Sequence, residues 1–361
     1  MKIGIDISQI VYETGVSTYT LNLVRNLLET DKANSYLLFG GALRKISNIK
    51  DKIAKIKGDY QLKTLPFPPT LADWIWNRLH ILPIEIFTGR LDVFHSSDWS
   101  QPPSRTFKVT TIHDLSPLKF SKMLHSRIVA VHKKRLELVK KEVDRIIVPS
   151  KATKKDLIAY GFSQEKIRLI PEAADPIFKP VQKSQIKNLK RKYKIDKDYL
   201  LAVGVGERKN SQRIIEAFKE IKENHKLKLI ILGNPYGKLK QDKDVIFIGH
   251  ASFEEMPAFY SGAIALIYPS LYEGFGLPIL EAFACHCPVV TSDVSSMPEV
   301  TGKAAVLVNP WQIGSIVLGI KEVLKNRDKY IKLGQKRLKK FSWQKTAQLT
   351  IKVYEEALKN L

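Results

Sequence analysis

Residues 263–284 read AIALIYPSLYEGFGLPILEAFA, in which an apolar run is followed by a glycine-containing turn and a second apolar stretch. The run at 263–268 has the length and composition of a buried strand. Pro278 suits the first turn of a helix, where its missing N–H has no partner to lose. Glycines in the turn leave main-chain N–H groups uncovered at the start of this helix, where the helix dipole favours a negative ligand such as a diphosphate.

The same order of apolar run and helical pattern recurs along the whole chain. Further apolar runs lie at 3–7, 36–39, 91–95, 109–113, 145–148, 168–170, 199–203, 228–232, 245–248, 289–291 and 305–308. Their alternation with helical patterns predicts parallel sheets that are covered by helices on both faces. A chain of 361 residues is also long for one hydrophobic core. We therefore expect an α/β protein with two doubly wound domains.

Proline marks the expected joint between these domains. The segment 171–180, PEAADPIFKP, holds three prolines in ten residues, cannot continue a helix and is expected to be an extended linker. After it, 183–194 has the pattern of a charged surface helix. At the other end of the chain, Ser342 is a suitable N-cap for a final helix.

Two carboxylates flank the glycine turn. Glu273 precedes it, and Glu281 lies inside the helix that follows. An acid beside a bound phosphate repels it unless the carboxylate is turned toward neutral hydroxyls, and the vicinal diols of a sugar or a ribose are such partners. Without further context, Glu273 is equally well a loop acid and Glu281 a partner of the helix dipole.

The pattern of two glutamates separated by seven residues, followed by PVVTS at 288–292, resembles the donor-site motif of glycosyltransferase family 4. The resemblance implies the GT-B fold, in which two Rossmann-like α/β domains with doubly wound parallel sheets face a central cleft. It implies a first domain of residues 1–172, to which residues 343–361 return, and a donor domain of residues 173–342.

The resemblance also implies roles in donor binding. In the family the first glutamate contacts the transferred sugar and the second holds the ribose, which places these roles on Glu273 and Glu281. Main-chain amides of the family's loop bind the sugar and the phosphates. In this sequence they are the amides of Gly274, Phe275, Gly276 and Leu277.

The segment VGVGERKN at 203–210 resembles the family's basic loop, in which a lysine neutralises the diphosphate leaving group. That role falls to Lys209, with support from Arg208. The loop is one residue longer than usual, and its first basic position is taken by Val205 or Gly206.

Two segments of the first half also resemble family motifs. TGVSTY at 14–19 resembles the glycine turn after strand one, which implies that Gly15 faces the donor phosphates. TIHDL at 111–115 ends a predicted strand, where ligands gather in α/β proteins, and the resemblance implies that His113 contacts the donor sugar. By itself, a histidine such as His113 is more often structural. Trp343 is expected to pack, not to bind a ligand.

By resemblance, the reaction transfers a hexose from a nucleotide diphosphate sugar with retention of anomeric configuration, and the catalytic candidates are His113, Lys209 and Glu273. The Arg-Lys-Asn loop resembles that of mannosyltransferases that use GDP-mannose, so mannose is favoured. The acceptor is expected to be a glycan or a polyprenyl-linked lipid of cell-envelope polysaccharide synthesis. Because main-chain N–H groups, the helix start and Lys209 can stabilise the departing charge, we expect neither a cofactor nor a metal.

The charge of the chain is its unusual bulk property. Lysine and arginine number 59 against 36 acidic residues, a formal net charge of +23. The excess fits an anionic partner, whether nucleic acid, a phosphate-bearing substrate or an acidic membrane surface, and it equally fits a lysine-rich composition without a partner. The basic residues 133–135 and 140–141, together with Trp74 and Trp76, permit docking on an anionic membrane, although solvated lysines and core tryptophans are the simpler explanation.

Three features indicate the compartment. Two cysteines cannot form a disulfide framework, and no apolar run approaches the roughly 20 residues that span a bilayer. The N-terminal run contains Asp6 and reads as a strand instead of a signal peptide. We expect a cytoplasmic protein that binds peripherally to the inner face of the cell membrane.

Two other classes of protein compete with the enzyme. A nucleic-acid-binding protein built on Rossmann-like domains would explain the charge, but no aromatic RNA-binding motif or helix-turn-helix pattern accompanies it, so no nucleic acid is expected. A non-catalytic homologue would bind the nucleotide sugar without turnover. The enzyme is favoured because four residues of the expected site occur together: His113, Lys209, Glu273 and Glu281.

Overall fold

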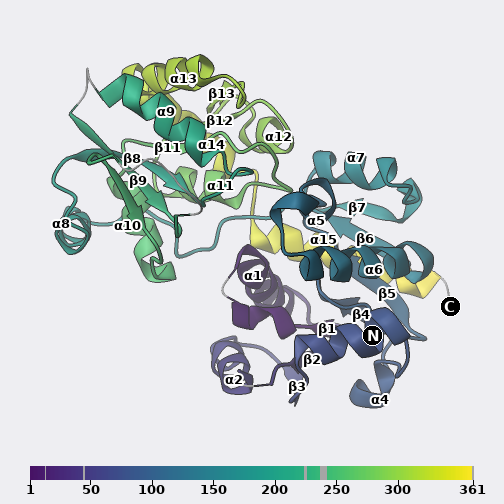
Figure 1. Ribbon diagram of the computed structural model, residues 1–361. Coiled ribbons are helices and arrows are strands. Elements are labelled where there is room, and N and C mark those ends of the chain that lie inside the picture. Colours follow the sequence, from purple (N-terminus) through teal and green to yellow (C-terminus); the bar gives the residue numbers. More distant parts are fainter. Residues whose placement is uncertain (13, 44, 223–225, 236–241, 360–361) are drawn as a thin grey trace. The chain divides into compact units, whose positions relative to one another are not determined.

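The computed structural model describes residues 1–12, 14–43, 45–222, 226–235 and 242–359. Its contacts divide the chain into two compact units (Figure 1), of which unit 1 comprises Met1–Glu172 with Ser342–Leu361, and unit 2 comprises Ala173–Phe341. The first division falls inside the proline-containing segment 171–180, which has no helix or strand. Ser342 groups with unit 1, one residue before the division expected from the sequence.

Unit 1 is built on a seven-stranded parallel sheet. Its strands are β1 (Lys2–Asp6), β2 (Ser35–Gly41), β3 (Tyr60–Leu65), β4 (Val93–Ser96), β5 (Phe107–Thr111), β6 (Arg145–Val148) and β7 (Ile167–Leu169). The order β3-β2-β1-β4-β5-β6-β7 changes direction between β1 and β4. In open α/β sheets, ligands bind at the carboxyl ends of the strands near such a change of direction.

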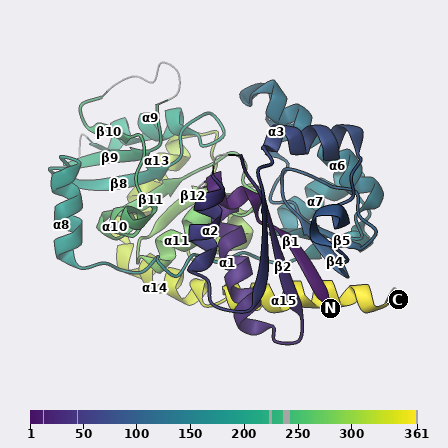
Figure 2. The ribbon, with the colours of Figure 1, turned by 90° about the horizontal axis from the view of Figure 1, so that it is seen from below.

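Helices pack on this sheet and on one another. The α-helices are α1 (Gly15–Thr30), α2 (Ile46–Ala54), α3 (Pro69–Ala72), α4 (Glu85–Thr88), α5 (Ser116–Lys119), α6 (Ser126–Glu142), α7 (Lys151–Ala159) and α15 (Trp343–Glu355). The unit also has a π-helix, η2 (Asp73–Leu79), and the short 3-10 helices η1 (Ser8–Tyr12), η3 (Ser121–Met123), η4 (Gln164–Lys166) and η6 (Glu356–Lys359). The C-terminal helix α15 lies against α1 (Figure 2), so the end of the chain returns to unit 1. The Ser342 hydroxyl accepts a hydrogen bond from the Lys345 N–H at 3.2 Å and caps α15.

Strand β3 escapes prediction from the sequence, whereas the other strands of the unit coincide with predicted apolar runs. Its sequence YQLKTL carries polar residues between the apolar ones, and Gln61 and Lys63 are exposed. The strand lies at the edge of the sheet, where it pairs with β2 alone. An edge strand needs no continuous apolar run because much of its surface stays in water.

Unit 2 repeats the architecture with a six-stranded parallel sheet in the order β10-β9-β8-β11-β12-β13. Its strands are β8 (Asp198–Val203), β9 (Leu227–Leu232), β10 (Val245–Ile248), β11 (Ala265–Tyr268), β12 (Val289–Ser292) and β13 (Val306–Val308). Its helices are α8 (Lys183–Lys192), α9 (Ser211–Lys222), α10 (Met256–Gly262), α11 (Leu277–Ala284), α12 (Met297–Thr301), α13 (Ile313–Lys325) and α14 (Arg327–Leu338), with the short turn η5 (Phe253–Glu255).

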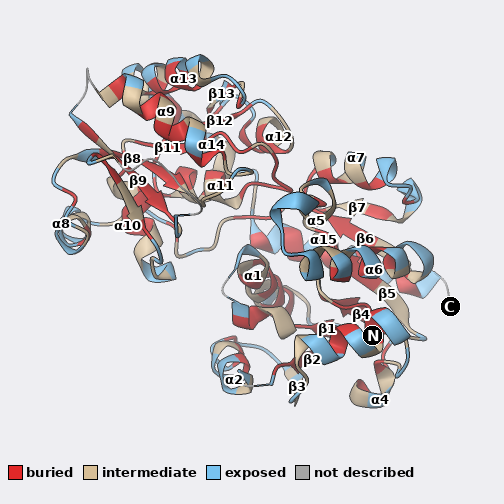
Figure 3. Ribbon diagram, viewed as in Figure 1, coloured by how far each residue is buried: buried red, intermediate tan, exposed pale blue. Residues whose placement is uncertain are grey.

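The sheet of unit 2 is buried on both faces, as the doubly wound prediction requires. Neighbouring residues of β8 enter different cores, since Leu201 packs in one hydrophobic cluster and Leu200 in the other. Ile230 and Ile231 of β9 divide in the same way. Successive side chains of a strand point to opposite faces, so each face of the sheet has its own core. Figure 3 shows these strands as mostly buried and the helices as exposed on their outer sides.

Among the described residues, no helix is long and apolar enough to cross a membrane.

Candidate functional site

The turn between β11 and α11 in unit 2 has the backbone that its glycines predict. Gly276 is the N-cap of α11 and adopts a left-handed conformation with φ of 103°, which a residue with a Cβ adopts only with strain. Gly274 does not need a positive φ. Pro278 lies in the first turn of α11. Glycine is therefore required by backbone geometry at 276 and not at 274.

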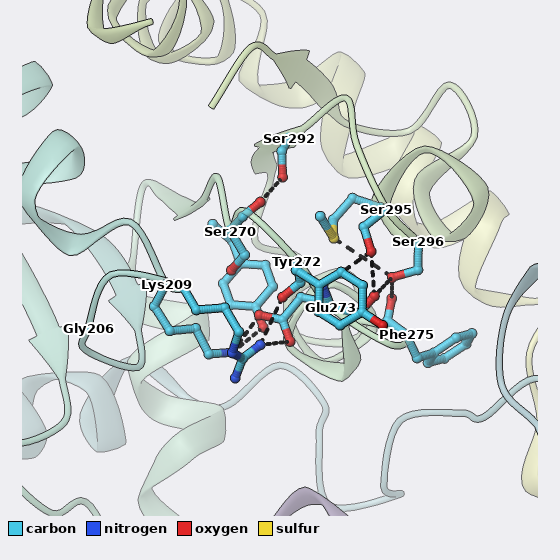
Figure 4. A network of polar contacts seen from close by, with 12 residues as sticks. Gly206, Lys209, Ser270, Tyr272, Glu273, Phe275, Ser292, Ser295 and Ser296 are labelled. Atoms are coloured by element: carbon cyan, nitrogen blue, oxygen red, sulfur yellow. Dashed lines mark hydrogen bonds and ion pairs between the residues drawn. The ribbon is translucent and has the colours of Figure 1, made fainter. Parts of the chain in front are cut away.

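Two serines after β12 hold the carbonyl groups of this turn (Figure 4). The Ser295 hydroxyl lies 2.7 Å from the carbonyl oxygen of Glu273, and the Ser296 hydroxyl lies 2.8 Å from that of Phe275. Among the residues that the structure describes, the main-chain N–H groups of Phe275 and Gly276 have no hydrogen-bond acceptor. Carbonyls turned toward the serines and N–H groups without an acceptor favour an anion at the start of α11.

The loop before α9 brings its two cations onto the first glutamate of the motif (Figure 4). Lys209 Nζ donates to Glu273 Oε1 at 2.7 Å and to the Tyr268 hydroxyl at 2.7 Å. Arg208 Nη1 lies 2.8 Å from Glu273 Oε2 and donates to the Tyr272 carbonyl at 2.8 Å. One carboxylate thus bridges two cations that come from a segment about 64 residues earlier in the chain.

These cations keep Glu273 ionised. Burial alone would raise the pKa of this carboxyl, but the charges of Lys209 and Arg208 outweigh burial and lower its pKa to about 2. The three side chains together carry one net positive charge, two cations against one carboxylate. A diphosphate that reaches the turn therefore meets a positive field, and it competes with Glu273 for Lys209 and Arg208.

The second glutamate has a different environment. Glu281 Oε2 accepts a hydrogen bond from the Tyr260 hydroxyl of α10 at 2.7 Å. The pKa of Glu281 is raised to about 7, because burial and the charge of Asp175 outweigh the hydrogen bond from Tyr260 and the charge of Lys209. Glu281 therefore changes its charge near neutral pH, whereas Glu273 does not.

The affinity for the donor is expected to fall as the pH is lowered through the pKa of Glu281. A ribose diol donates to an ionised carboxylate, and below about pH 7 the carboxyl is protonated and loses acceptor capacity. If only the ionised form binds, the affinity drops about tenfold between about pH 8 and about pH 6. Calorimetry with an intact nucleotide sugar measures this, because its diphosphate is esterified at both ends and does not titrate there. The variant Glu281→Gln should bind more weakly and without this pH dependence; an unchanged dependence in the variant would remove Glu281 from the site.

In unit 1, His113 follows the carboxyl end of β5. Its Nδ1 lies 2.8 Å from Glu172 Oε1, and its carbonyl accepts from the Thr153 hydroxyl at 3.2 Å. The ring meets the ring of Tyr19 edge-on, with centroids 4.6 Å apart. Ser150 caps α7 through the Thr153 N–H, which gives the segment 148–153 a structural role.

Gly15 opens α1, the long helix after β1. It does not have a positive φ, and among the described residues no atom lies within 4 Å of where its Cβ would be. Neither backbone geometry nor crowding in unit 1 therefore requires a glycine here. The role in phosphate binding that the resemblance implies for Gly15 stays a prediction.

Some residues expected at the surface are buried. Trp76 is 2% exposed and Trp74 is 55% exposed, so only one of the two tryptophans is available to a partner. Arg135 is 1% exposed and donates to the Thr110 hydroxyl at 2.6 Å, so it is not part of the basic face of α6. Trp343 is buried against Tyr19, in agreement with a packing role.

Two acidic triplets in unit 2, Asp196-Lys197-Asp198 and Asp242-Lys243-Asp244, have the Asp-x-Asp pattern that can bind a metal. The second triplet pairs with lysines, since Lys222 Nζ lies 2.6 Å from Asp242 Oδ2 and Lys228 Nζ lies 3.1 Å from Asp244 Oδ1. Within the described part of the chain, no group of three or more His, Cys, Asp or Glu side chains is arranged to hold a metal ion.

Several contacts of the site lie beyond what the sequence predicts. The unpredicted residues are Glu172, Tyr260, Tyr268, Ser295 and Ser296. Each contacts a site residue that is distant in the sequence, and no local sequence motif predicts any of these contacts. The predicted residues fall into two groups: Arg208, Lys209, Glu273, the loop amides and Glu281 in unit 2, and Gly15 and His113 in unit 1.

Comparison with known proteins gives matches over nearly the whole chain. A family model described as Glycosyltransferase Family 4 matches residues 14–177, and one described as Glycosyl transferases group 1 matches residues 185–340. The O-antigen chain mannosyltransferase B of Escherichia coli is 26% identical over 369 residues, which cover 95% of this chain and 96% of that protein.

Solved structures of similar fold cover the full chain. A sucrose-phosphate synthase from Thermosynechococcus elongatus superposes with a TM-score of 0.73 at 18% identity and covers 100% of both chains. The Anabaena protein HepE, solved in complex with UDP and glucose, gives a TM-score of 0.72 at 14% identity over 99% of this chain and 100% of that one. At these identities the similarity shows the fold, which is the GT-B arrangement of two parallel-sheet α/β domains.

Proposed function

Because the chain belongs to glycosyltransferase family 4, we propose that it moves a mannosyl residue from GDP-mannose to a glycan or polyprenyl-linked acceptor of cell-envelope polysaccharide. Membership of the family establishes glycosyl transfer, and we propose the sugar, the nucleotide and the acceptor. One observation carries the proposal: Lys209 and Arg208 meet at Glu273 beside the start of α11.

The chemistry requires positive charge where the nucleotide leaves. The anomeric C–O bond breaks, its electron pair departs with the diphosphate, and the sugar becomes oxocarbenium-like. Lys209, Arg208, the Phe275 and Gly276 amides and the helix dipole of α11 stabilise the departing charge. The acceptor hydroxyl attacks the same face of the sugar and gives its proton to the departing phosphate, so the anomeric configuration is retained. This scheme uses no cofactor and no metal.

The identity of the donor can be tested with a single thermal-shift screen. Similarity to a mannosyltransferase favours GDP-mannose, while the HepE structure, which contains UDP and glucose, makes UDP-glucose the natural competitor. Thermal shift with a panel of nucleotide sugars ranks them, because stabilisation grows with ligand concentration relative to its Kd. We expect the largest shift with GDP-mannose. A larger shift with UDP-glucose would overturn the choice of sugar, and no shift with any nucleotide sugar would contradict the donor site itself.

We further propose that unit 1 docks on an anionic membrane, where a lipid-linked acceptor would lie. Large apolar side chains are exposed in the segment that includes α3, η2 and α4: Leu71, Trp74, Leu79, Ile81, Leu82 and Ile86. The π-helix η2 packs against α6, which exposes four lysines, Lys133, Lys134, Lys140 and Lys141. Apolar side chains beside lysines suit the interface of an acidic bilayer.

The variant Trp74→Ser is expected to weaken binding to vesicles of phosphatidylglycerol and phosphatidylcholine severalfold, because an exposed tryptophan gains free energy at the interface. Trp311→Ser is the matched control, since Trp311 of unit 2 is 54% exposed. Sedimentation at low salt measures both variants against wild type. Equal binding by the three proteins, or no preference for acidic over neutral vesicles, would count against the docking surface.

A further inference from the structure

The chain leaves unit 1 at Glu172, and the side chain of this residue turns back into the unit. Glu172 is 4% exposed, and its Oε1 lies 2.8 Å from Nδ1 of His113. The contact joins a linker residue to a histidine 59 positions earlier in the chain. A buried carboxylate needs a partner that can donate, and His113 is that partner.

His113 is held through its main chain and its ring. The Thr153 hydroxyl donates to the main-chain carbonyl of His113, Tyr19 meets the ring edge-on, and Glu172 contacts Nδ1. The other ring nitrogen, Nε2, is buried and has no hydrogen-bond partner among the described residues. A buried polar atom without a partner costs free energy, so a ligand group that completes this bond is favoured there.

We infer that Glu172 is a positioning residue: it holds the imidazole of His113 with Nδ1–H toward the carboxylate and thereby presents Nε2 to a hydroxyl of the substrate. This inference rests on the proposed transfer reaction. In the neutral ring, an Nδ1–H bound to a carboxylate leaves the lone pair on Nε2, which accepts from a hydroxyl. In the protonated ring, Nε2–H donates instead, and the ring orientation is the same.

The electrostatic surroundings agree with this arrangement. Burial would lower the pKa of His113, but the hydrogen bond and charge of Glu172 raise it, with further contributions from Asp98 and Asp114. His95, the other histidine nearby, is buried between Tyr354 and Thr111, and its pKa is lowered. Tyr19 is kept neutral by burial, which raises its pKa. Of these groups, Glu172 contacts the ring directly, through Nδ1 at 2.8 Å.

The linker does not need this contact for its attachment to unit 1. The Thr346 hydroxyl of α15 donates to the Pro171 carbonyl at 2.7 Å and anchors the chain immediately before Glu172. The isosteric variant Glu172→Gln keeps the shape of the side chain and removes its charge. We therefore expect this variant to fold with an almost unchanged Tm.

The test is nuclear magnetic resonance on the full chain labelled with 15N-histidine. In wild type, His113 should be protonated at Nδ1 and titrate at a higher pH than in Glu172→Gln, by about one pH unit or more. The exposed Glu165 provides the control, Glu165→Gln, which should leave the His113 signals unchanged. Identical tautomer and titration of His113 in wild type and Glu172→Gln would overturn the inference.

A kinetic cycle tests the positioning role separately. Glu172→Gln should lower kcat roughly tenfold in the wild-type background, as expected for a misplaced catalytic contact, and should lower it no further in a His113→Asn background. An equal loss in both backgrounds would show that Glu172 does not act through His113. The resonance experiment needs no turnover, so a failure of the proposed reaction and a failure of the positioning role give different results.

Discussion

The variant Lys209→Ala is expected to lower kcat about 10²- to 10³-fold, the scale for removing one group that stabilises developing negative charge. Lys209 Nζ lies 2.7 Å from Glu273 Oε1 and 4.8 Å from the centre of the Tyr268 ring, so its ammonium group is fixed in place before a donor arrives. A preorganised charge stabilises a leaving diphosphate without rearrangement. Measured single-turnover rates give the effect on the chemical step.

The fold should survive this change. Arg208 Nη1 lies 2.8 Å from Glu273 Oε2, so we expect the buried carboxylate to keep one cation in the variant. Lys187→Ala on the exposed face of α8 is the control, and it should leave kcat unchanged. Wild-type turnover by soluble, folded Lys209→Ala would show that this lysine does not stabilise the leaving group.

The second large effect is expected at Glu273, and it has an unusual sign. Glu273→Gln should lower kcat about 10²-fold, because the carboxylate assigned to the transferred sugar is lost. The same variant should bind the nucleoside diphosphate product as tightly as wild type or several times more tightly. The carboxylate competes with the diphosphate for Lys209 and Arg208, and the amide competes far less.

Calorimetry with the nucleoside diphosphate, beside steady-state kinetics with the donor, separates the two effects. Glu220→Gln in α9, which replaces an exposed glutamate of the same unit, is the control. Weaker binding of the nucleoside diphosphate by Glu273→Gln would mean that the cations do not face the phosphates. The charge of Glu273 does not change with pH in these measurements, because its pKa is lowered to about 2 and the carboxylate is ionised throughout the neutral range.

Much of the architecture is encoded locally and can be predicted. Apolar runs that are buried on both faces, such as β9 and β11, stand out from their neighbours in the sequence. The turn before α11 is also predictable from local sequence, since backbone geometry requires Gly276 and the first helical turn accommodates Pro278. Strand β3 is half exposed and lacks such a signal.

The contacts of the site are harder to predict, because they join loops that only the folded sheet brings together. The ends of β8 and β11 are neighbours, which places Lys209 on Glu273, yet nothing in either loop specifies that pairing. The resemblance indicates that both residues bind the donor, but not that they bind each other. The same holds for Tyr260 on Glu281. Burial then determines the pKa of Glu281, and burial is a property of the fold.

The most direct measurement is a crystal structure of the protein soaked with an intact nucleotide sugar. We predict that the diphosphate lies at the start of α11, within hydrogen-bond distance of the Phe275 or Gly276 N–H, with Lys209 and Arg208 on its oxygens and Glu281 on the ribose. A nucleotide sugar bound elsewhere in the protein, with Lys209 and Arg208 still paired to Glu273, would contradict this prediction.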